Sequence, residues 1–242
     1  MNGIRRVFVR WLAPLFGGAT MLMAGEGLPL VEYAVPDPVD ARAPLVVLVS
    51  GDGGWAEIDR ELAQRWRNRG WPVVGLNALK YFWQKRTPAA FAETINDLVT
   101  TYRARWGARP VVLAGFSFGA DTVPFAYNRL PANTRSTVMA MVLLSPAEAS
   151  MWEAGMASWW GGSSAGPKIA PEVAAIAPLP VLIITGEADP DAFDDWVERP
   201  CLEHEKWPGD HHLDRRYDRI DTTVAAFWAR IGSSPTDLPE AR

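Results

Sequence analysis

The sequence predicts an α/β fold, in which helices cover both faces of a mostly parallel β-sheet. Three observations support this prediction. Short aliphatic runs alternate along the chain with longer amphipathic stretches, as in folds built from β-α units. The aliphatic runs are continuous, which is typical of strands that are buried on both faces. The 242 residues, about half of them apolar, suffice for one globular domain.

The expected strands and helices follow one another in this alternating order. The helix near residue 88 has the clearest start, because Thr87 can cap it and Pro88 suits the first helical position. Gly70 and Pro131 end two of the other helices. The expected strands are 28–35, 45–49, 72–76, 111–114, 138–144, 181–185 and 202–207. The expected helices are 58–69, 88–105, 118–129 and 217–231.

The segment 147–178 interrupts this alternation of strands and helices. It contains Trp152, Trp159 and Trp160, a Gly-Gly-Ser-Ser stretch and three prolines, and it shows no clear period. We expect a small flap that contributes to substrate binding, because long irregular segments in compact domains are commonly active-site lids or binding loops. The alternative is a plain excursion of the chain between a strand and a helix.

The composition argues against nucleic-acid binding and against disulfides. The net charge is −4, so a broad cationic surface for nucleic acid is not expected. Cys201 is the single cysteine, so no intramolecular disulfide can form. The sequence shows no metal-ligand spacing and no phosphate-binding loop. We therefore expect a site that uses neither a metal nor a cofactor.

The first 25 residues are typical of an export signal. Arg5, Arg6 and Arg10 form a basic region, and residues 12–24 form an uncharged apolar stretch that ends in small residues. We expect residues 1–25 to be a signal peptide and residues 26–242 to form the folded domain. Cleavage or retention as an anchor, and export by the general or the twin-arginine route, remain open at this point.

The most informative stretch is Gly-Phe-Ser-Phe-Gly at 115–119. It follows an aliphatic run and precedes a helical stretch, which is the strand–turn–helix setting of a nucleophile elbow. Such a turn lifts the serine hydroxyl clear of the sheet edge, so Ser117 is the candidate nucleophile. An acid and a histidine follow Ser117 in the chain order of α/β-hydrolases. This order predicts an α/β-hydrolase fold and a serine hydrolase that acts on carboxylic esters.

A serine hydroxyl needs a base that removes its proton as it attacks. The chain offers three histidines. His204 lies inside an expected strand and is expected to be structural. His211 and His212 lie in the loop after that strand, where α/β-hydrolases carry their base. We prefer His211, and His212 remains the alternative.

A third group must hold the imidazole in one tautomer and stabilise its charged form. Asp189 lies just past the strand at 181–185, which is the usual position of this acid. Glu187, Asp191 and Glu148 are the alternatives, the last because some hydrolases take the acid from the preceding strand.

Two backbone amides are expected to stabilise the oxyanion that forms during ester cleavage. The amide of Phe118 directly follows the nucleophile at the start of a helix. The second amide is expected in the glycine-rich loop at 50–54, where Asp52 is the best candidate and Gly53 the next.

Five stretches occur in a fixed order through most of the chain: SGDGGW at 50–55, YFWQKRTP at 81–88, GFSFGAD at 115–121, NRLP at 128–131 and PGDHHLD at 208–214. Together they resemble the VirJ/AcvB family of exported bacterial proteins, whose fold is similar to that of α/β-hydrolases. AcvB-like members are associated with periplasmic hydrolysis of lysyl-phosphatidylglycerol, and VirJ-like members with virulence and type IV secretion. The chain has the length of the one-domain, VirJ-like form. It departs from the family at Asp210, at Leu213 and around 190–196.

The resemblance implies a periplasmic esterase that acts on an aminoacylated phospholipid at the membrane surface. The rival function is a non-catalytic virulence protein that contacts proteins of a type IV secretion system. For the esterase, we expect Asp52 or Asp121 to pair with the amine of the substrate. Alternatively, Asp121 only supports the elbow helix by hydrogen bonding. Trp55, in the same loop as Asp52, is a further candidate for substrate binding.

The aromatic and basic stretch at 81–86 is a candidate membrane contact. Lys85 and Arg86 would meet anionic phosphate, and Trp83 would enter the lipid interface. The alternative is a buried aromatic cluster.

Overall fold

A seven-stranded sheet with the strand order β1-β3-β2-β4-β5-β6-β7 organises the molecule. The computed structural model describes residues 27–35, 40, 42–107, 109–150 and 166–232. β1 pairs antiparallel with β3, and all other neighbouring strands in this sheet are parallel. The strands are β1 (Leu30–Tyr33), β2 (Leu45–Val49), β3 (Val73–Leu76), β4 (Val111–Phe116), β5 (Val138–Leu144), β6 (Val181–Gly186) and β7 (Leu202–Trp207). The helices are α1 (Glu57–Asn68), α2 (Ala78–Tyr81), α3 (Pro88–Trp106), α4 (Phe118–Asn128), α5 (Ala132–Arg135), α6 (Ile169–Ala175) and α7 (Tyr217–Gly232), with a 3₁₀ turn at Leu213–Arg215.

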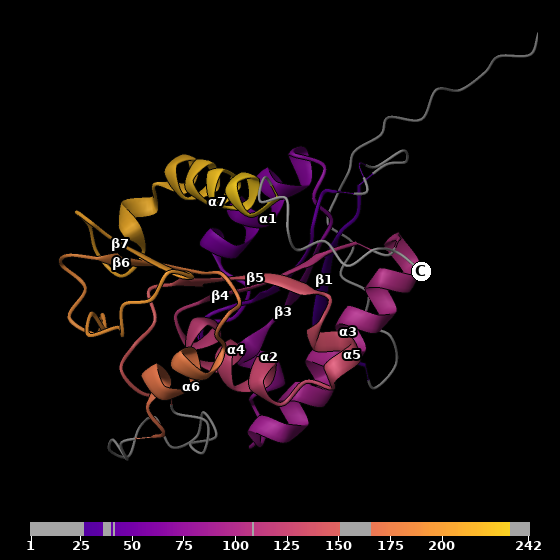
Figure 1. Cartoon of the computed structure of the whole chain (residues 1–242), viewed down its shortest axis with the longest axis horizontal. Coiled ribbons are helices and arrows are strands. Elements are labelled where there is room, and N and C mark those ends of the chain that lie inside the picture. The colour runs from indigo at the N-terminus through magenta and orange to yellow at the C-terminus, as the bar shows by residue number, and fades with distance from the viewer. Residues whose placement is uncertain (1–26, 36–39, 41, 108, 151–165, 233–242) are drawn as a thin grey trace, which may run out of the picture.

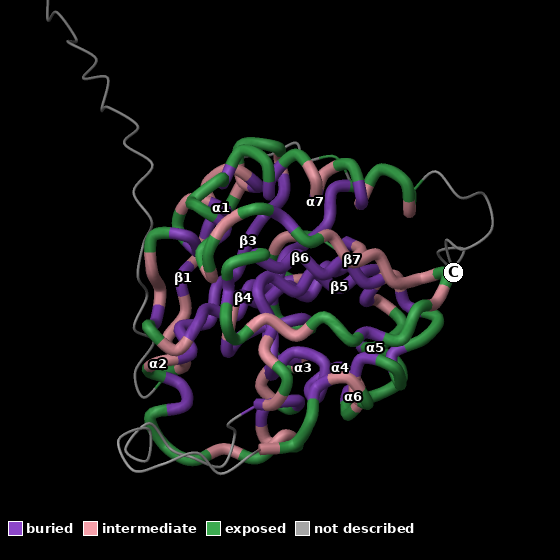
Figure 2. Tube along the Cα trace, turned by 90° about the vertical axis from the view of Figure 1, so that its left-hand side faces the viewer, coloured by how far each residue is buried: buried purple, intermediate pink, exposed green. Residues whose placement is uncertain are grey.

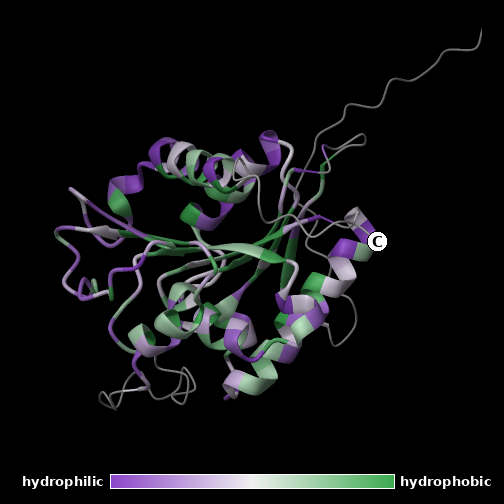
Figure 3. Cartoon of the chain, viewed as in Figure 1, coloured by the Kyte–Doolittle hydropathy of each residue, from purple (hydrophilic) through white to green (hydrophobic). Residues whose placement is uncertain are grey.

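Helices cover both faces of the sheet. α1 and α7 lie together on one face, and α2 to α6 lie on the other (Figure 1). Along β2, Val46 and Leu48 pack with α1 and α7, whereas Val47 and Val49 pack with α3 and α4. Successive side chains of a strand point to opposite faces, so a strand covered on both sides needs an apolar residue at every position. The strands accordingly appear as a hydrophobic layer between helices whose outer faces are hydrophilic (Figure 3).

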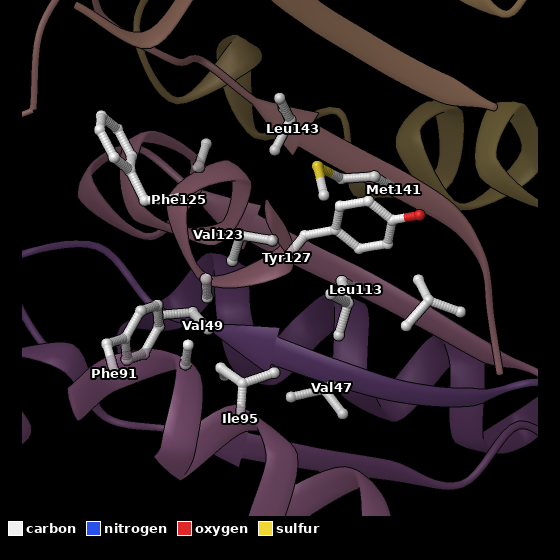
Figure 4. Close-up of a cluster of buried hydrophobic side chains, with 14 of the residues drawn as sticks. Val47, Val49, Phe91, Ile95, Leu113, Val123, Phe125, Tyr127, Met141 and Leu143 are labelled. Carbon is white, nitrogen blue, oxygen red and sulfur yellow. The ribbon is translucent and has the colours of Figure 1, made fainter. Parts of the chain in front are cut away.

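The core under α3 and α4 fixes the start of α4, where the candidate nucleophile lies. Val49 of β2 and Leu113 of β4 face Ile95 of α3 and Val123 of α4 (Figure 4). Each of these side chains is at most 1% exposed. Truncating one such side chain to alanine typically destabilises a domain by about 2–5 kcal/mol. The position of α4 is therefore held by tight packing on the sheet.

The predicted α/β-hydrolase architecture, with its mostly parallel sheet, is confirmed. The ends of β2, β5 and β7 agree with the strands expected from the sequence. β4 extends two residues further than expected, because its pairing with β5 continues to Phe116 and Leu144. The sequence does not predict α2 and α5, since helices of four residues are too short to show a hydrophobic period.

The described part of the expected flap at 147–178 differs from the expectation. Its C-terminal half contains α6, whose Ile169 and Val173 are buried in the core. The side chain of Asn128 donates to the backbone oxygen of Glu172 at 2.9 Å, and Arg129 forms an ion pair with the Glu172 carboxylate at 3.0 Å. This half is therefore an integral helix that packs on α4, and not a flap. Residues 151–165 lie outside the described residues.

The expected signal peptide, residues 1–25, also lies outside the described residues. Among the helices that are described, none combines the length and the apolar character that crossing a membrane requires.

Candidate active site

Ser117 occupies a sharp turn between β4 and α4. Its backbone adopts φ 52° and ψ −122°, a conformation that residues other than glycine rarely take. A Cβ atom added at Gly115 would lie 2.4 Å from the carbonyl carbon of Gly119, so the turn can close only without side chains at these positions. Strained backbone that the surrounding structure enforces is typical of functional sites. The turn thus has the geometry of a nucleophile elbow.

Two hydrogen bonds join Ser117 to His211 and His211 to Asp189. Nε2 of His211 lies 2.8 Å from Oγ of Ser117, and Nδ1 of His211 lies 2.7 Å from Oδ2 of Asp189. The three residues follow β4, β7 and β6, which are parallel strands that end at the same edge of the sheet. The topology therefore brings together side chains that are up to 94 positions apart in the chain.

Burial separates Asp189 from its sequence alternatives. The Asp189 side chain is completely buried, and its Oδ1 accepts a hydrogen bond from the backbone amide of Asp191 at 3.1 Å. Glu187 is exposed, and Glu148 forms an ion pair with Lys168 at 2.9 Å. Among the candidate acids, Asp189 is the one that contacts His211.

The glycine-rich loop after β2 passes directly beside Ser117. A Cβ atom at Gly51 would lie 3.4 Å from the Cβ of Ser117. Ser50 fixes the start of this loop, because its hydroxyl donates to the Gly51 oxygen and accepts from the amide of Ala78 at 2.9 Å. The next amide along the chain is that of Asp52, and no hydrogen bond from it to another described residue is recorded. On the other side, Phe118 supplies the first amide of α4.

Comparison with known proteins identifies the family. Residues 43–230 match the family described as bacterial virulence protein (VirJ). The chain belongs to the VirJ family. No curated protein matches the chain.

Solved structures similar to this VirJ-family chain are α/β-hydrolases. A putative dienelactone hydrolase from Klebsiella pneumoniae subsp. pneumoniae is 16% identical, with a TM-score of 0.64 over 88% of this chain and 98% of that chain. Est1E from Butyrivibrio proteoclasticus is 15% identical, with a TM-score of 0.61 over 88% of this chain and 100% of that chain. An α/β serine hydrolase without a lid from Xanthomonas campestris is 16% identical, with a TM-score of 0.56 over 95% of this chain and 100% of that chain. At such low identity the likeness establishes the shared fold.

Contacts that the sequence does not predict hold the His211 loop of the VirJ-family protein. The Ser145 hydroxyl donates to the backbone oxygen of His211 at 2.8 Å. The carboxylate of Asp210 accepts hydrogen bonds from the amides of His212 and Asp214 at 2.8 and 3.1 Å, and the Asp214 amide lowers the pKa of Asp210. A Cβ atom at Gly186 would lie only 2.3 Å from the backbone oxygen of Asp210. The loop can therefore pack on the end of β6 only because residue 186 has no side chain. The departure from the family pattern at Asp210 is the one sequence signal for this arrangement.

His212 does not contact Ser117. Its ring packs on the rings of Phe116 and His211, at centroid distances of 5.5 and 5.6 Å. His204 lies in β7, where its Nε2 is 2.9 Å from the hydroxyl of Thr185. Of the three histidines, His211 alone is placed to accept the proton of Ser117.

Asp121 links the elbow helix to the segment after β5. Its Oδ1 accepts a hydrogen bond from the amide of Ala147 at 2.8 Å. The pKa of Asp121 is raised to about 8, chiefly by burial and in smaller part by the neighbouring charges of Asp52 and Asp191, while the hydrogen bond from Ala147 lowers it. Asp121 therefore supports the helix, as the alternative interpretation expected, and the charges of Asp52 and Asp191 act on its carboxyl group.

Trp55 packs on the sheet, away from the triad. Its indole fills the space above Gly75, where an added Cβ atom would lie 2.0 Å from the ring. The ring also approaches that of Tyr33, with a centroid distance of 6.3 Å. The expectation that Trp55 binds substrate finds no support in this position. Trp55 instead anchors the far end of the loop that carries Asp52.

Proposed function

We propose that this VirJ-family protein is a serine esterase that cleaves its substrate through an acyl-enzyme. One observation carries the proposal: a continuous hydrogen-bonded chain from Asp189 through His211 to Ser117, on a strained elbow beside a glycine-rich loop. A nucleophile, a base and an orienting acid in this arrangement are what acyl transfer requires.

In the proposed reaction, Oγ of Ser117 attacks the ester carbonyl while Nε2 of His211 takes the hydroxyl proton. The amides of Phe118 and Asp52 would stabilise the negative charge on the carbonyl oxygen. When the tetrahedral intermediate collapses, His211 returns the proton to the leaving alcohol, and the acyl group remains on Ser117. A water molecule then attacks the acyl-enzyme with the same base, which releases the acid. Asp189 keeps Nδ1 of His211 protonated and stabilises the imidazolium.

The proposed substrate is an aminoacyl ester of phosphatidylglycerol, with lysine as the acyl group. Membership of the VirJ family favours this class through the family's resemblance to AcvB-like proteins. Two carboxylates near the start of α4 also favour it, because the charges of Asp52 and Asp191 both act on Asp121, whose backbone amide donates to the oxygen of Ser117. Such a site attracts a cationic amine next to the scissile carbonyl. The export signal expected at residues 1–25 would place the enzyme in the periplasm.

Labelling with a fluorophosphonate probe tests whether the protein is an enzyme. We expect the wild-type protein to be labelled and the Ser117→Ala variant to remain unlabelled. A folded wild-type protein that the probe does not label would contradict the proposal and favour a non-catalytic secretion protein.

Hydrolysis of lysyl-phosphatidylglycerol, compared with a neutral acyl ester of the same lipid, tests the substrate. We expect Asp52→Asn to raise KM for the lysyl ester only. Equal effects on both esters would refute recognition of the amine, but they would not contradict the proposed esterase activity.

A further inference from the structure

A pocket lies beside the active site, next to α2. It has a volume of about 720 Å³ and lies between residues 27–29 and the chain from Leu79 to Arg86. Its position is tied to the active site. The amide of Ala78 at the start of α2 donates to Ser50 in the loop beside Ser117, and the ring of Phe82 meets that of Phe118 at 5.0 Å. The pocket therefore opens near the same edge of the sheet as Ser117.

Two cationic side chains without a carboxylate partner line this pocket. No described carboxylate lies within ion-pair distance of Lys80 or Arg86. The guanidinium of Arg86 lies 5.0 Å from the ring centroid of Tyr81. Its Nε is buried and has no hydrogen-bond acceptor among the described residues. A buried donor without an acceptor is unfavourable, so a ligand with an anionic oxygen would satisfy it.

The aromatic residues around the pocket divide into a buried and an exposed group. Tyr81 and Phe82 are buried and pack against Phe91, as the cluster interpretation expected. Trp83 is 70% exposed, in the largely exposed turn between α2 and α3 (Figure 2). An exposed indole beside unpaired cations is typical of a surface that meets a lipid interface, where the ring enters the headgroup region and the cations meet phosphate.

We propose that this pocket binds the phosphate group of an anionic phospholipid and docks the protein on a lipid surface. Lys80 and Arg86 pair with the phosphate oxygens, and Trp83 enters the interface beside them. Because the pocket and Ser117 share one edge of the sheet, docking turns the elbow toward the membrane. The proposal goes beyond the esterase activity, since docking requires no turnover.

Co-sedimentation with vesicles tests the docking. All variants carry Ser117→Ala, so the lipid is not consumed, and loss of docking is measured separately from loss of hydrolysis. We expect binding to vesicles that contain phosphatidylglycerol, and much weaker binding to vesicles of phosphatidylcholine alone. Adding Lys80→Gln and Arg86→Gln together is expected to weaken binding about 10- to 30-fold, as for the loss of two cations next to an anionic surface.

Arg42→Gln with Arg135→Gln is the matched control, because it removes the same charge elsewhere. Both arginines are exposed, and they precede β2 and β5, so they lie at the opposite edge of the sheet. The apolar residues 12–24 are present in every variant, and comparison with the control removes their contribution. We expect the control to bind as tightly as the protein with Ser117→Ala alone. Equal binding by the pocket and control variants would overturn the proposal.

Two further measurements separate the remaining explanations. If the pocket double variant does not fold, Lys80→Glu and Trp83→Ser replace it, because both side chains are exposed, and each is expected to weaken vesicle binding. Inorganic phosphate is also added at constant ionic strength. Displacement of the protein from vesicles by phosphate would show a site for free anions and overturn docking on lipid, whereas unchanged binding supports it.

Discussion

The hydroxyl of Ser145, after β5, donates a hydrogen bond to the backbone oxygen of His211 at 2.8 Å. This contact positions the candidate base from a strand that carries none of the three triad residues. Ser145 itself has a positive φ of 49°, so the end of β5 turns sharply to bring its hydroxyl there. The placement of His211 therefore depends on three strand ends, those of β5, β6 and β7.

Replacing Ser145 by alanine is expected to slow the reaction more than it weakens substrate binding. Without the hydrogen bond, the His211 loop can shift, and a small misplacement of a catalytic group lowers kcat by about 10- to 100-fold. KM should change little, because Ser145 is buried and its hydroxyl is directed to the backbone of His211. Steady-state kinetics with a chromogenic ester measures the two constants. A proportional rise in KM with unchanged kcat would show that Ser145 acts on binding instead.

Asp189→Asn is expected to leave the fold intact and to lower kcat by about 10⁴-fold, as the wrong tautomer of the histidine is then favoured. Glu187→Gln and Glu148→Gln are the matched controls, since each removes one nearby carboxylate that does not contact His211. We expect both controls to retain near-wild-type kcat. A loss of activity in Glu148→Gln equal to that in Asp189→Asn would refute the assignment of the acid.

Ser117→Gly should stabilise the protein relative to Ser117→Ala. At φ 52° and ψ −122°, glycine is free of the strain that any Cβ atom causes. The expected gain in the free energy of unfolding is about 1 kcal/mol. Urea unfolding of the two inactive variants measures it. Equal stabilities would mean that the elbow is not strained in the folded protein.

The stability of the wild-type protein should fall as the pH rises from about 4 to 8 because of Asp121. Burial raises the pKa of Asp121 to about 8, so in this range the folded state keeps a proton that the unfolded chain has lost. The free energy of unfolding then decreases by up to about 1.4 kcal/mol per pH unit from this group. Burial also raises the pKa of Asp59 to about 7, which adds the same trend below that pH.

Asp121→Asn isolates the contribution of this one group, because the amide oxygen can still accept the hydrogen bond from Ala147 while the side chain no longer titrates. The variant should lose less stability between pH 5 and pH 8 than the wild-type protein in urea unfolding experiments, with Asp59 contributing equally to both. Identical pH profiles would show that Asp121 titrates normally in the folded state.

The sequence predicted those parts of the fold that carry a strong periodic signal. The unbroken aliphatic runs located β2 and β5, because strands buried on both faces leave no polar position. The glycine-flanked serine located the elbow, because close approach at Gly115 excludes every other residue type. Short helices such as α2 contain too few residues for a pattern, and their positions are determined by contacts such as that between Ala78 and Ser50.

Sequence order could narrow the candidate site but could not choose among neighbouring residues. Glu187 and Asp189 are two positions apart and chemically similar, and burial of Asp189 against His211 separates them. Ser145 carries no signal beyond its position after a strand, since its role depends on an oxygen 66 positions away in the chain. For Trp55 the sequence suggested a function that the structure does not support. Its place in a glycine-rich loop suggested contact with a ligand, whereas its ring packs in the space above Gly75.

The fit of Trp55 over Gly75 has a consequence for how the proposed oxyanion site works. The hydrogen bond between Ser50 and Ala78 fixes one end of the loop, and the packing of the Trp55 indole over Gly75 fixes the other. If the amide of Asp52 stabilises the oxyanion as proposed, a loop fixed in this way holds it in place before any ester binds, and little reorganisation is left for the chemical step. Enlarging Gly75 would displace the indole and loosen the loop, so a change in β3 would slow the reaction without altering any residue that meets the substrate.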